Sequence, residues 1–484
     1  MPNFPLLLVV IFGLSACSKA PEFDQSELTP AGEMTAKRVS HRTYVVEGEG
    51  VDSLQKLNFW TGFSLFRDPW VIAPSSTKDR DGLGPLFNTR SCISCHSRGG
   101  RGPAPEQGIS SPTAMVIRLG LKDSVDKSLS FHDTETFKNY GEQIQPRAIN
   151  TIHTSRLPEP LTPEAKLKLE YDLIKDTYPD GTQYELRKPH YELVDLAYSD
   201  IPDSIGLSPR FSPIVYGAGL LDAISEQDLL AQEDINDLDQ DGISARYNRV
   251  PLIKLYLSSE LQPDATKGVG RFGHKAKHPS LGQQIAAAFR DDIGITNSWY
   301  PEESCTQIQH KCAIASELGQ HSSIEIPDKL LALVIDTNQF MAVPPARNLT
   351  SEKAQAGREI FYQAGCATCH TPSYTTAANY PVAALANQKI WPYTDLALHD
   401  MGQGLADGVT ENDASGQEWR TPPLWGLGAQ KIFRKQPLYL HDGRARSVEE
   451  AILWHGGEAQ SSNTYFKKLS KIERQQLVAF LNAI

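Results

Sequence analysis

Two copies of one short motif constrain this chain more than any other feature. They are Cys92-Ile93-Ser94-Cys95-His96 and Cys366-Ala367-Thr368-Cys369-His370. Cys-x-x-Cys-His is the attachment signature of c-type haem: the two thiols form thioethers with the haem vinyl groups, and the adjacent histidine becomes an axial ligand of the iron. A single copy could be half of a zinc site, but the chain's 7 cysteines include no further Cys-x-x-Cys to complete one. The sequence therefore predicts two covalently bound haem c groups, with His96 and His370 as iron ligands.

The N-terminus has the pattern of an export signal. Phe4 to Leu14 is an apolar run too short to span a bilayer, and Leu14-Ser15-Ala16-Cys17 resembles the bacterial lipobox, whose cysteine is lipidated after cleavage. We expect a signal peptide over residues 1–16, a lipid-anchor tether over 17–45 and a mature chain in the periplasm, anchored by lipid to the outer membrane. The alternative is an ordinary signal peptide with a coincidental cysteine at position 17.

Composition limits the partners. The chain has 484 residues and a net charge of −11, which argues against nucleic acid or anionic lipid and permits docking of a small basic redox protein. No later segment is apolar enough to span a membrane, so we expect membrane attachment only through the lipid.

Two cysteines remain after the anchor and the haem motifs, Cys305 and Cys312. In an oxidising compartment we expect them to form a disulfide that closes a short loop. The alternative is two free thiols.

An acidic stretch resembles the first half of a calcium loop. Asp237, Asp239 and Asp241 alternate and Gly242 follows, as at the sharp turn of such a loop. Asn248 stands where an EF-hand would have its bidentate glutamate, so the match is partial. The sequence allows a calcium site or a solvated acidic turn.

The spacing of apolar residues predicts a helix before each haem motif, over Ser53 to Phe66 and Ser351 to Ala364, and a C-terminal helix over residues 471–484 with Ser470 and Glu473 as its capping box. Residues 113–119 and 191–196 are more typical of strands. We therefore expect a mainly α fold: two c-type cytochrome domains in tandem, over 46–340 and 341–484, with a long irregular, β-containing insertion in the first.

The two halves share an internal repeat. Ser212 to Gly219 resembles Thr421 to Gly428, and Ser280 and Ser447 each open a helix with a capping-box pattern. In this register the position of His455 in the second half corresponds to Ala288 in the first. If His455 reaches the second iron, that haem is bis-histidine, while the methyl group of Ala288 leaves the first iron open.

Two polar residues share the predicted helix face with Ala288. Gln284 and Asp292 each lie four residues from it. Gln284 could hydrogen-bond an oxygen ligand of the iron, and Asp292 could transfer a proton as a general acid–base. The alternative is that both are structural or solvent-facing. Met401 and His399 are rival ligands for the second iron; His274 and His278 could close the first.

At this point the sequence resembles the bacterial di-haem oxidoreductase family, to which peroxidase activity is ascribed. The resemblance covers about residues 50–484 and is carried by these motifs: Gly84-Pro85-Leu86-Phe87-Asn88, Arg271-Phe272-Gly273, Asp292-Ile293-Gly294-Ile295-Thr296, Leu398-His399-Asp400-Met401-Gly402, Trp419-Arg420-Thr421-Pro422-Pro423-Leu424, His441-Asp442-Gly443-Arg444-Ala445 and Trp454-His455-Gly456-Gly457. The chain departs from the pattern at His274, where we expect tryptophan.

The family is similar in turn to bacterial di-haem cytochrome c peroxidases. In those proteins the His-Asp-Gly motif precedes the distal ligand of the electron-transferring haem, usually methionine, and the same spacing from His441 reaches His455. They also place a glutamine and an acid over the peroxidatic haem, for which Gln284 and Asp292 are the nearest matches, although their spacing here is shorter.

The resemblance implies an enzyme that passes electrons from a small periplasmic donor, through the haem of His370 and His455, to the haem of His96, where hydrogen peroxide or a related oxidant is reduced. Two alternatives remain: a di-haem oxygenase, as in the related rubber oxygenases, and an electron-transfer cytochrome without catalysis.

Overall fold

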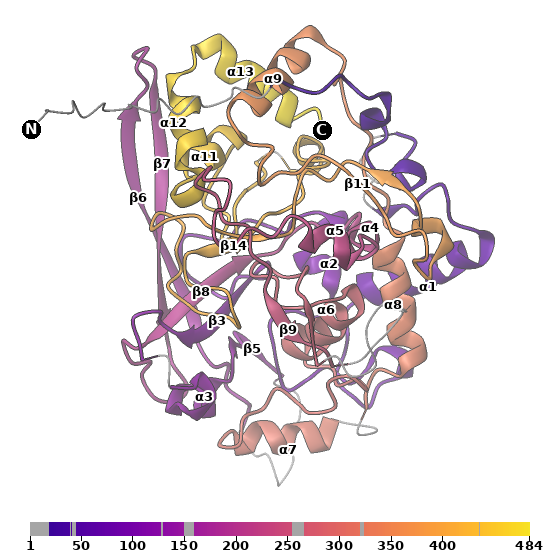
Figure 1. Cartoon of the computed structure of the whole chain (residues 1–484). Coiled ribbons are helices and arrows are strands. Elements are labelled where there is room, and N and C mark those ends of the chain that lie inside the picture. Colours follow the sequence, from indigo (N-terminus) through magenta and orange to yellow (C-terminus); the bar gives the residue numbers. More distant parts are fainter. Residues whose placement is uncertain are drawn as a thin grey trace, which may run out of the picture.

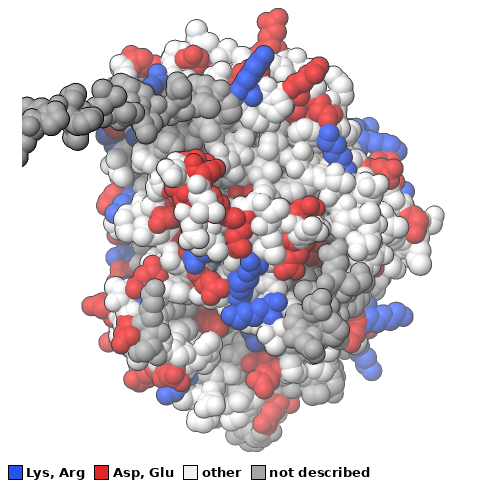
Figure 2. Space-filling model, viewed as in Figure 1, with Lys and Arg blue, Asp and Glu red and all other residues white. Residues whose placement is uncertain are grey.

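The computed structural model describes residues 19–484 except 39, 41–44, 127–128, 150–158, 254–265, 320–323 and 435. The expected signal peptide and Cys17 lie outside the described residues. Within them, no helix is long and apolar enough to cross a membrane. Figure 2 shows acidic and basic side chains interspersed over one face of the molecule.

Each haem motif is preceded by a helix that crosses the last helix of its own half of the chain. In the first half, α1 (Ser53–Arg67) packs on α8 (Asp328–Gln339); in the second, α9 (Glu352–Gln363) packs on α13 (Lys471–Leu481). Both crossings are close, because a Cβ at Gly62 would lie 1.9 Å from Leu333 O and one at Gly357 would lie 2.0 Å from Gln476 O. The predicted helices before the motifs and at the C-terminus are thus confirmed.

The remaining helices are short. They are α2 (Cys92–Cys95), α3 (Glu135–Tyr140), α4 (Ala218–Asp222), α5 (Glu226–Leu230), α6 (Leu281–Ala288), α7 (His310–Gly319), α10 (Gln430–Phe433), α11 (Val448–Leu453) and α12 (Gln460–Lys468). Ser280 caps α6 and Ser447 caps α11, as their spacing predicts.

The strands form several small antiparallel sheets. Three-stranded sheets have the orders β4-β3-β8 and β2-β6-β7, and four strand pairs are β1-β5, β9-β10, β11-β12 and β13-β14. Their bounds are β1 Leu86–Phe87, β2 Gly108–Ser110, β3 Met115–Leu121, β4 Gln143–Ile144, β5 Arg147–Ala148, β6 Lys166–Thr177, β7 Gln183–Val194, β8 Ile205–Phe211, β9 Arg249–Pro251, β10 Lys267–Val269, β11 Tyr374–Thr375, β12 Lys389–Ile390, β13 Leu398–Asp400 and β14 Glu418–Arg420.

The expectation of a mainly α fold is wrong. The structure is 31% helical and 19% strand, and it is not a mainly α cytochrome c arrangement. The largest source of the difference is the hairpin of β6 and β7, which pairs over the whole length of both strands and stands along one side of the molecule (Figure 1). Leu167 and Leu169 alternate with polar residues in β6, which is the period of a half-buried strand and excludes a helix.

Part of the expected tether is packed against the C-terminal half. Glu27 is buried and accepts a hydrogen bond of 2.7 Å from Arg358, and Trp391 N donates to Pro30 O at 2.7 Å. Residues 25–34 form two short 3-10 helices, Gln25–Leu28 and Gly32–Met34. The buried ion pair of Glu27 with Arg358 of α9 thus joins this stretch to the helix that precedes the second haem motif.

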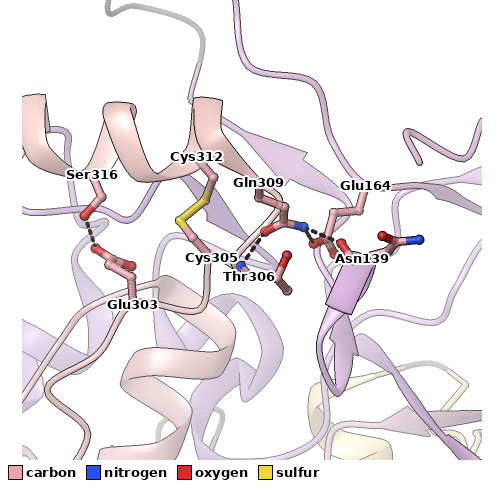
Figure 3. The surroundings of a disulfide bond; sticks show 8 residues. All are labelled: Asn139, Glu164, Glu303, Cys305, Thr306, Gln309, Cys312 and Ser316. Carbon is pink, nitrogen blue, oxygen red and sulfur yellow. Dashed lines mark hydrogen bonds between the residues drawn. A yellow bond between two sulfur atoms is a disulfide. The ribbon is translucent and has the colours of Figure 1, made fainter. Parts of the chain in front are cut away.

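The disulfide between Cys305 and Cys312 is confirmed. Figure 3 shows the loop that it closes, with Gln309 beside it. Gln309 Nε2 donates to Glu164 Oε1 at 2.6 Å and to Asn139 O at 2.8 Å, so the loop is joined to the strand-rich part of the first half.

Candidate functional site: one cavity joins both motifs

A single cavity is lined by residues from both haem motifs. Those of the first motif are Cys92, Cys95 and His96, and those of the second are Cys366, Cys369 and His370. The structure brings all but the calcium residues of the predicted site to this cavity: Gln284, Ala288, Asp292, Met401 and His455 line it as well. Residues separated by more than 350 positions therefore share one chamber, a result that the motif spacing alone could not show.

Three histidines of the cavity are suited to bind iron. A backbone carbonyl accepts from Nδ1 in each: Pro213 O at 2.8 Å for His96, Tyr393 O at 3.0 Å for His370 and Ala451 O at 2.7 Å for His455. Because Nδ1 carries the proton, Nε2 keeps its lone pair. Burial lowers the pKa of His96 and of His370 to about 4 and also lowers that of His455, so all three rings are neutral.

The four thiols of the motifs are not in disulfides. Burial raises the pKa of Cys92 and of Cys366 to about 12, and it also raises the pKa of Cys95 and Cys369. All four thiols line the cavity in which a haem macrocycle would lie.

Among the rival ligands, His399 also lines the cavity, but both of its ring nitrogens have carboxylate partners. Its Nδ1 lies 2.7 Å from Glu458 Oε2 and its Nε2 lies 2.8 Å from Asp395 Oδ2. Burial opposes a charge there, but Asp395, by its charge and its hydrogen bond, and the neighbouring sulfur of Cys369 together outweigh it and raise the pKa of His399 well above its usual range. An imidazolium that donates from both nitrogens has no lone pair for iron.

The other rivals stay at the cavity. Met401, His274 and His278 all line it. Nε2 of His274 lies 2.8 Å from Phe211 O, whereas Nδ1 of His278 is buried without a hydrogen-bond partner in the described structure. Burial lowers the pKa of His278 to about 3, so this ring too is neutral.

Gln284 and Asp292 come from one helical segment with a change of pitch. α6 ends at Ala288 and continues as a π-helical turn over Phe289–Ile293. Turns of this kind are frequent at functional sites. Gln284 lines the cavity, and its buried Oε1 has no hydrogen-bond partner among the described residues, so this acceptor is unused.

Asp292 is held by a partner that sequence reasoning missed. Gln143 Nε2 donates to Asp292 Oδ1 at 2.9 Å, and the backbone amides of Asn88 and Thr89, just before the first haem motif, donate to Asp292 O at 2.9 and 3.0 Å. Burial and the neighbouring carboxylate of Asp291 raise the pKa of Asp292 to about 6. A carboxyl with this pKa can take up and release a proton near neutral pH.

The chain matches one protein-family model over residues 53–484, that of the "Di-haem oxidoreductase, putative peroxidase" family. The chain belongs to the di-haem oxidoreductase family. None of the curated proteins compared with this di-haem oxidoreductase is similar enough to count as a relative.

Membership of the di-haem oxidoreductases implies two haems, and the residues of the cavity fit them. Besides the imidazoles and thiols, three arginines line the cavity with a buried nitrogen that has no partner among the described residues: Arg101 Nε, Arg210 Nη2 and Arg271 Nε. Each group also has protein partners: Arg210 Nη1 pairs with Glu411 at 2.7 Å, while Arg101 Nη1 and Arg271 Nη1 donate to backbone carbonyls. The remaining N–H of each arginine suits the propionate carboxylates that a haem carries. The sequence shows these arginines but gives no reason to place them together.

The acidic loop of this di-haem oxidoreductase brings together a different set of carboxylates from the expected one. Ligand oxygens of Asp234, Asp237 and Asp239 lie within 4.8 Å of one another, and Asp241 is not in this group. The loop is joined to the C-terminal half, because Ser244 Oγ donates to Glu458 Oε1 at 2.7 Å, and Ile243 lines the cavity.

Proposed function

We propose that this di-haem oxidoreductase is a peroxidase in which the two irons have different tasks. When bound, the haems would supply the redox chemistry, the second as an electron store with His370 and His455 as ligands and the first as the site of peroxide reduction with His96 as its protein ligand. Two electrons and two protons convert one hydrogen peroxide into two waters. Both haems are proposed to be covalently attached, through Cys92 and Cys95 and through Cys366 and Cys369.

The observation that carries the proposal is the asymmetry of the cavity wall. The helix of the first half presents Ala288, whose methyl group cannot bind iron, while the corresponding helix end in the second half presents the neutral imidazole of His455. Beside Ala288 lie the unused oxygen of Gln284 and the carboxyl of Asp292. In this proposal Gln284 accepts a hydrogen bond from bound peroxide, and Asp292 takes a proton from one peroxide oxygen and returns it to the other.

The partners and location of the proposal rest on the sequence. A lipid on Cys17 would hold the protein at the outer membrane, facing the periplasm, and the net charge of −11 permits docking of a small basic electron donor.

Electron paramagnetic resonance of the ferric, haem-loaded protein, combined with steady-state peroxide reduction by a reduced cytochrome, tests the proposal. We expect one low-spin and one high-spin iron and a peroxide-dependent turnover. Two low-spin irons without turnover would instead identify an electron carrier, with His278 or His274 as a candidate sixth ligand. A stable dioxygen adduct on the first haem would identify an oxygenase.

Calcium is part of the proposal at the loop of Asp237 and Asp239, with Asp234 in place of the more distant Asp241. Carboxylates and carbonyls are the ligands that calcium prefers. Isothermal titration with calcium should show one site that Asp239→Asn weakens at least tenfold; equal heats in the two proteins would remove calcium from the proposal.

A further inference from the structure

The hairpin of β6 and β7 connects the two halves of the molecule. At its base, Leu167 is buried in an apolar cluster with Met115 of β3 and Phe211 of β8. At its far end, Tyr178 and Leu186 are buried in the cluster that also holds the residues of α9, α11 and α13. A two-stranded hairpin alone is marginally stable in water, so the C-terminal half is the support of its far end (Figure 1).

The far end of the hairpin contacts the start of α11. Tyr178 Oη donates to Glu449 Oε1 at 2.7 Å. Arg446 donates to Glu185 O of β7 at 3.1 Å and to Glu450 Oε1 at 2.8 Å. Arg446 thus joins β7 to the first turn of the helix, and Tyr178 holds Glu449 of the same turn.

The middle of the hairpin contacts the segment that leads into α11. Arg187 Nε donates to Arg444 O at 2.7 Å, and Arg187 Nη2 donates to Gly443 O at 2.9 Å. The Arg187 guanidinium lies 4.3 Å from the ring centre of Tyr171 on the paired strand, which fixes its direction. Tyr191 Oη donates to Asp442 Oδ2 at 3.2 Å.

These contacts bear on His455 because α11 is short. The helix covers only Val448–Leu453, and a helix of this length is not stable by itself. His455 follows directly, and both its backbone and its ring depend on the helix: His455 N donates to Ile452 O at 3.1 Å and Nδ1 to Ala451 O at 2.7 Å. So short a helix moves as one unit, so displacing its start strains the hydrogen bonds that hold the imidazole. Among these are the bonds from Asn463 Nδ2 of α12 to Leu453 O and His455 O, each 2.8 Å.

We propose that the hairpin of β6 and β7 is a brace that positions His455 as an iron ligand, with Arg187 and Tyr178 as its positioning residues. The inference rests on the proposed ligation of the second haem by His455. The inference gives the strand-rich insertion of the first half a function, which is to keep His455 in place as the sixth ligand of the second haem.

Carbon monoxide binding to the ferrous, haem-loaded full chain tests the brace, since carbon monoxide needs a vacant iron position. We expect the second haem of the wild-type protein to bind carbon monoxide slowly or not at all. Tyr178→Phe combined with Arg187→Met should increase the rate at the second haem at least tenfold and should speed hydrogen exchange of the α11 amides to a similar extent. Tyr178→Phe alone, which removes one hydroxyl group, should show part of both effects in a protein that keeps its core.

Lys168→Met is the matched control. Lys168 lies on the same hairpin and donates to Glu192 at 3.0 Å, away from the C-terminal half, so its loss should leave both readouts unchanged. Wild-type rates of carbon monoxide binding and hydrogen exchange in the single and double brace variants, with no methionine–iron band in the double variant, would overturn the inference. A methionine–iron band in the double variant would support it, because it would show Met401 replacing a displaced His455.

A further variant separates this inference from the proposed function. If His455→Ala opens the second haem to carbon monoxide and the brace variants do not, only the brace is wrong. If His455→Ala changes nothing, the ligation itself is wrong, and the proposed function falls with it.

Discussion

Asp292 combines a buried position, a pKa raised to about 6 and a hydrogen bond from Gln143. As the base that takes a proton from peroxide it must be ionised, so activity should rise as the pH rises through about 6. Asp292→Asn should lower kcat/KM about 100-fold or more and remove this limb of the pH profile. Steady-state rates from pH 5 to 8 are the measurement. Asp200→Asn, at an exposed position, serves as control; an unchanged limb in Asp292→Asn would exclude Asp292 as the base.

Gln284 lines the cavity, and its buried Oε1 has no hydrogen-bond partner in the described structure. Gln284→Leu should lower kcat/KM for peroxide about tenfold, the value of one hydrogen bond of about 1.4 kcal/mol, and should leave the melting temperature unchanged or higher. Gln283→Ala is the control, because the Gln283 amide donates to Pro251 O at 3.0 Å and its side chain does not line the cavity. Wild-type activity in both variants would show that Gln284 has no part in the reaction.

The disulfide loop anchors Gln309, whose side chain donates a hydrogen bond to Glu164. Glu164 in turn accepts a hydrogen bond from Gln145 N at 2.6 Å. The Cys305→Ala, Cys312→Ala double variant should lose roughly 2.5 kcal/mol of unfolding free energy, the loop entropy of a short closed loop. Denaturant unfolding with and without reductant measures it. Reductant should destabilise the wild-type protein and not the variant; equal sensitivity of both would mean that another bond is being reduced.

For the whole molecule, burial raises the pKa of Glu164 and of Glu325 to about 8. A group with a raised folded-state pKa keeps its proton in the folded protein after the unfolded chain has lost it, so stability falls as the pH rises. His399, whose pKa is also raised, lowers the stability further as the pH rises above about 6.5. Histidines with a lowered pKa change the stability only below about pH 6.5. The melting temperature should therefore fall from pH 6.5 to 8.

Glu164→Gln isolates the part of this pH dependence of stability that comes from Glu164. Each such carboxyl can contribute up to about 1.4 kcal/mol per pH unit, so the variant should show a flatter dependence between pH 6.5 and 8. The same slope in both proteins would contradict the raised pKa of Glu164. Glu159→Gln is a suitable control, because its exposed carboxylate has a pKa below the usual value and is fully ionised in this window.

The sequence by itself determined the features that depend on spacing along the chain. The two haem motifs, the helices that precede them, the caps at Ser280 and Ser447 and the bond of Cys305 to Cys312 each involve residues a few positions apart, where local geometry leaves few choices. The internal repeat was long enough to pair His455 with Ala288, and the cavity includes both residues.

Only the tertiary structure decided the rest, because it depends on contacts that the spacing of residues along the chain does not fix. These features are the strand content, the bond of Gln143 to Asp292, the ion pairs of His399, the carboxylate group that contains Asp234 instead of Asp241, and the contact of Arg187 with Arg444. The sequence around each of these residues gives no sign of its partner. Burial and pairing free energies are set by what surrounds a side chain, and that is known only once the chain has folded.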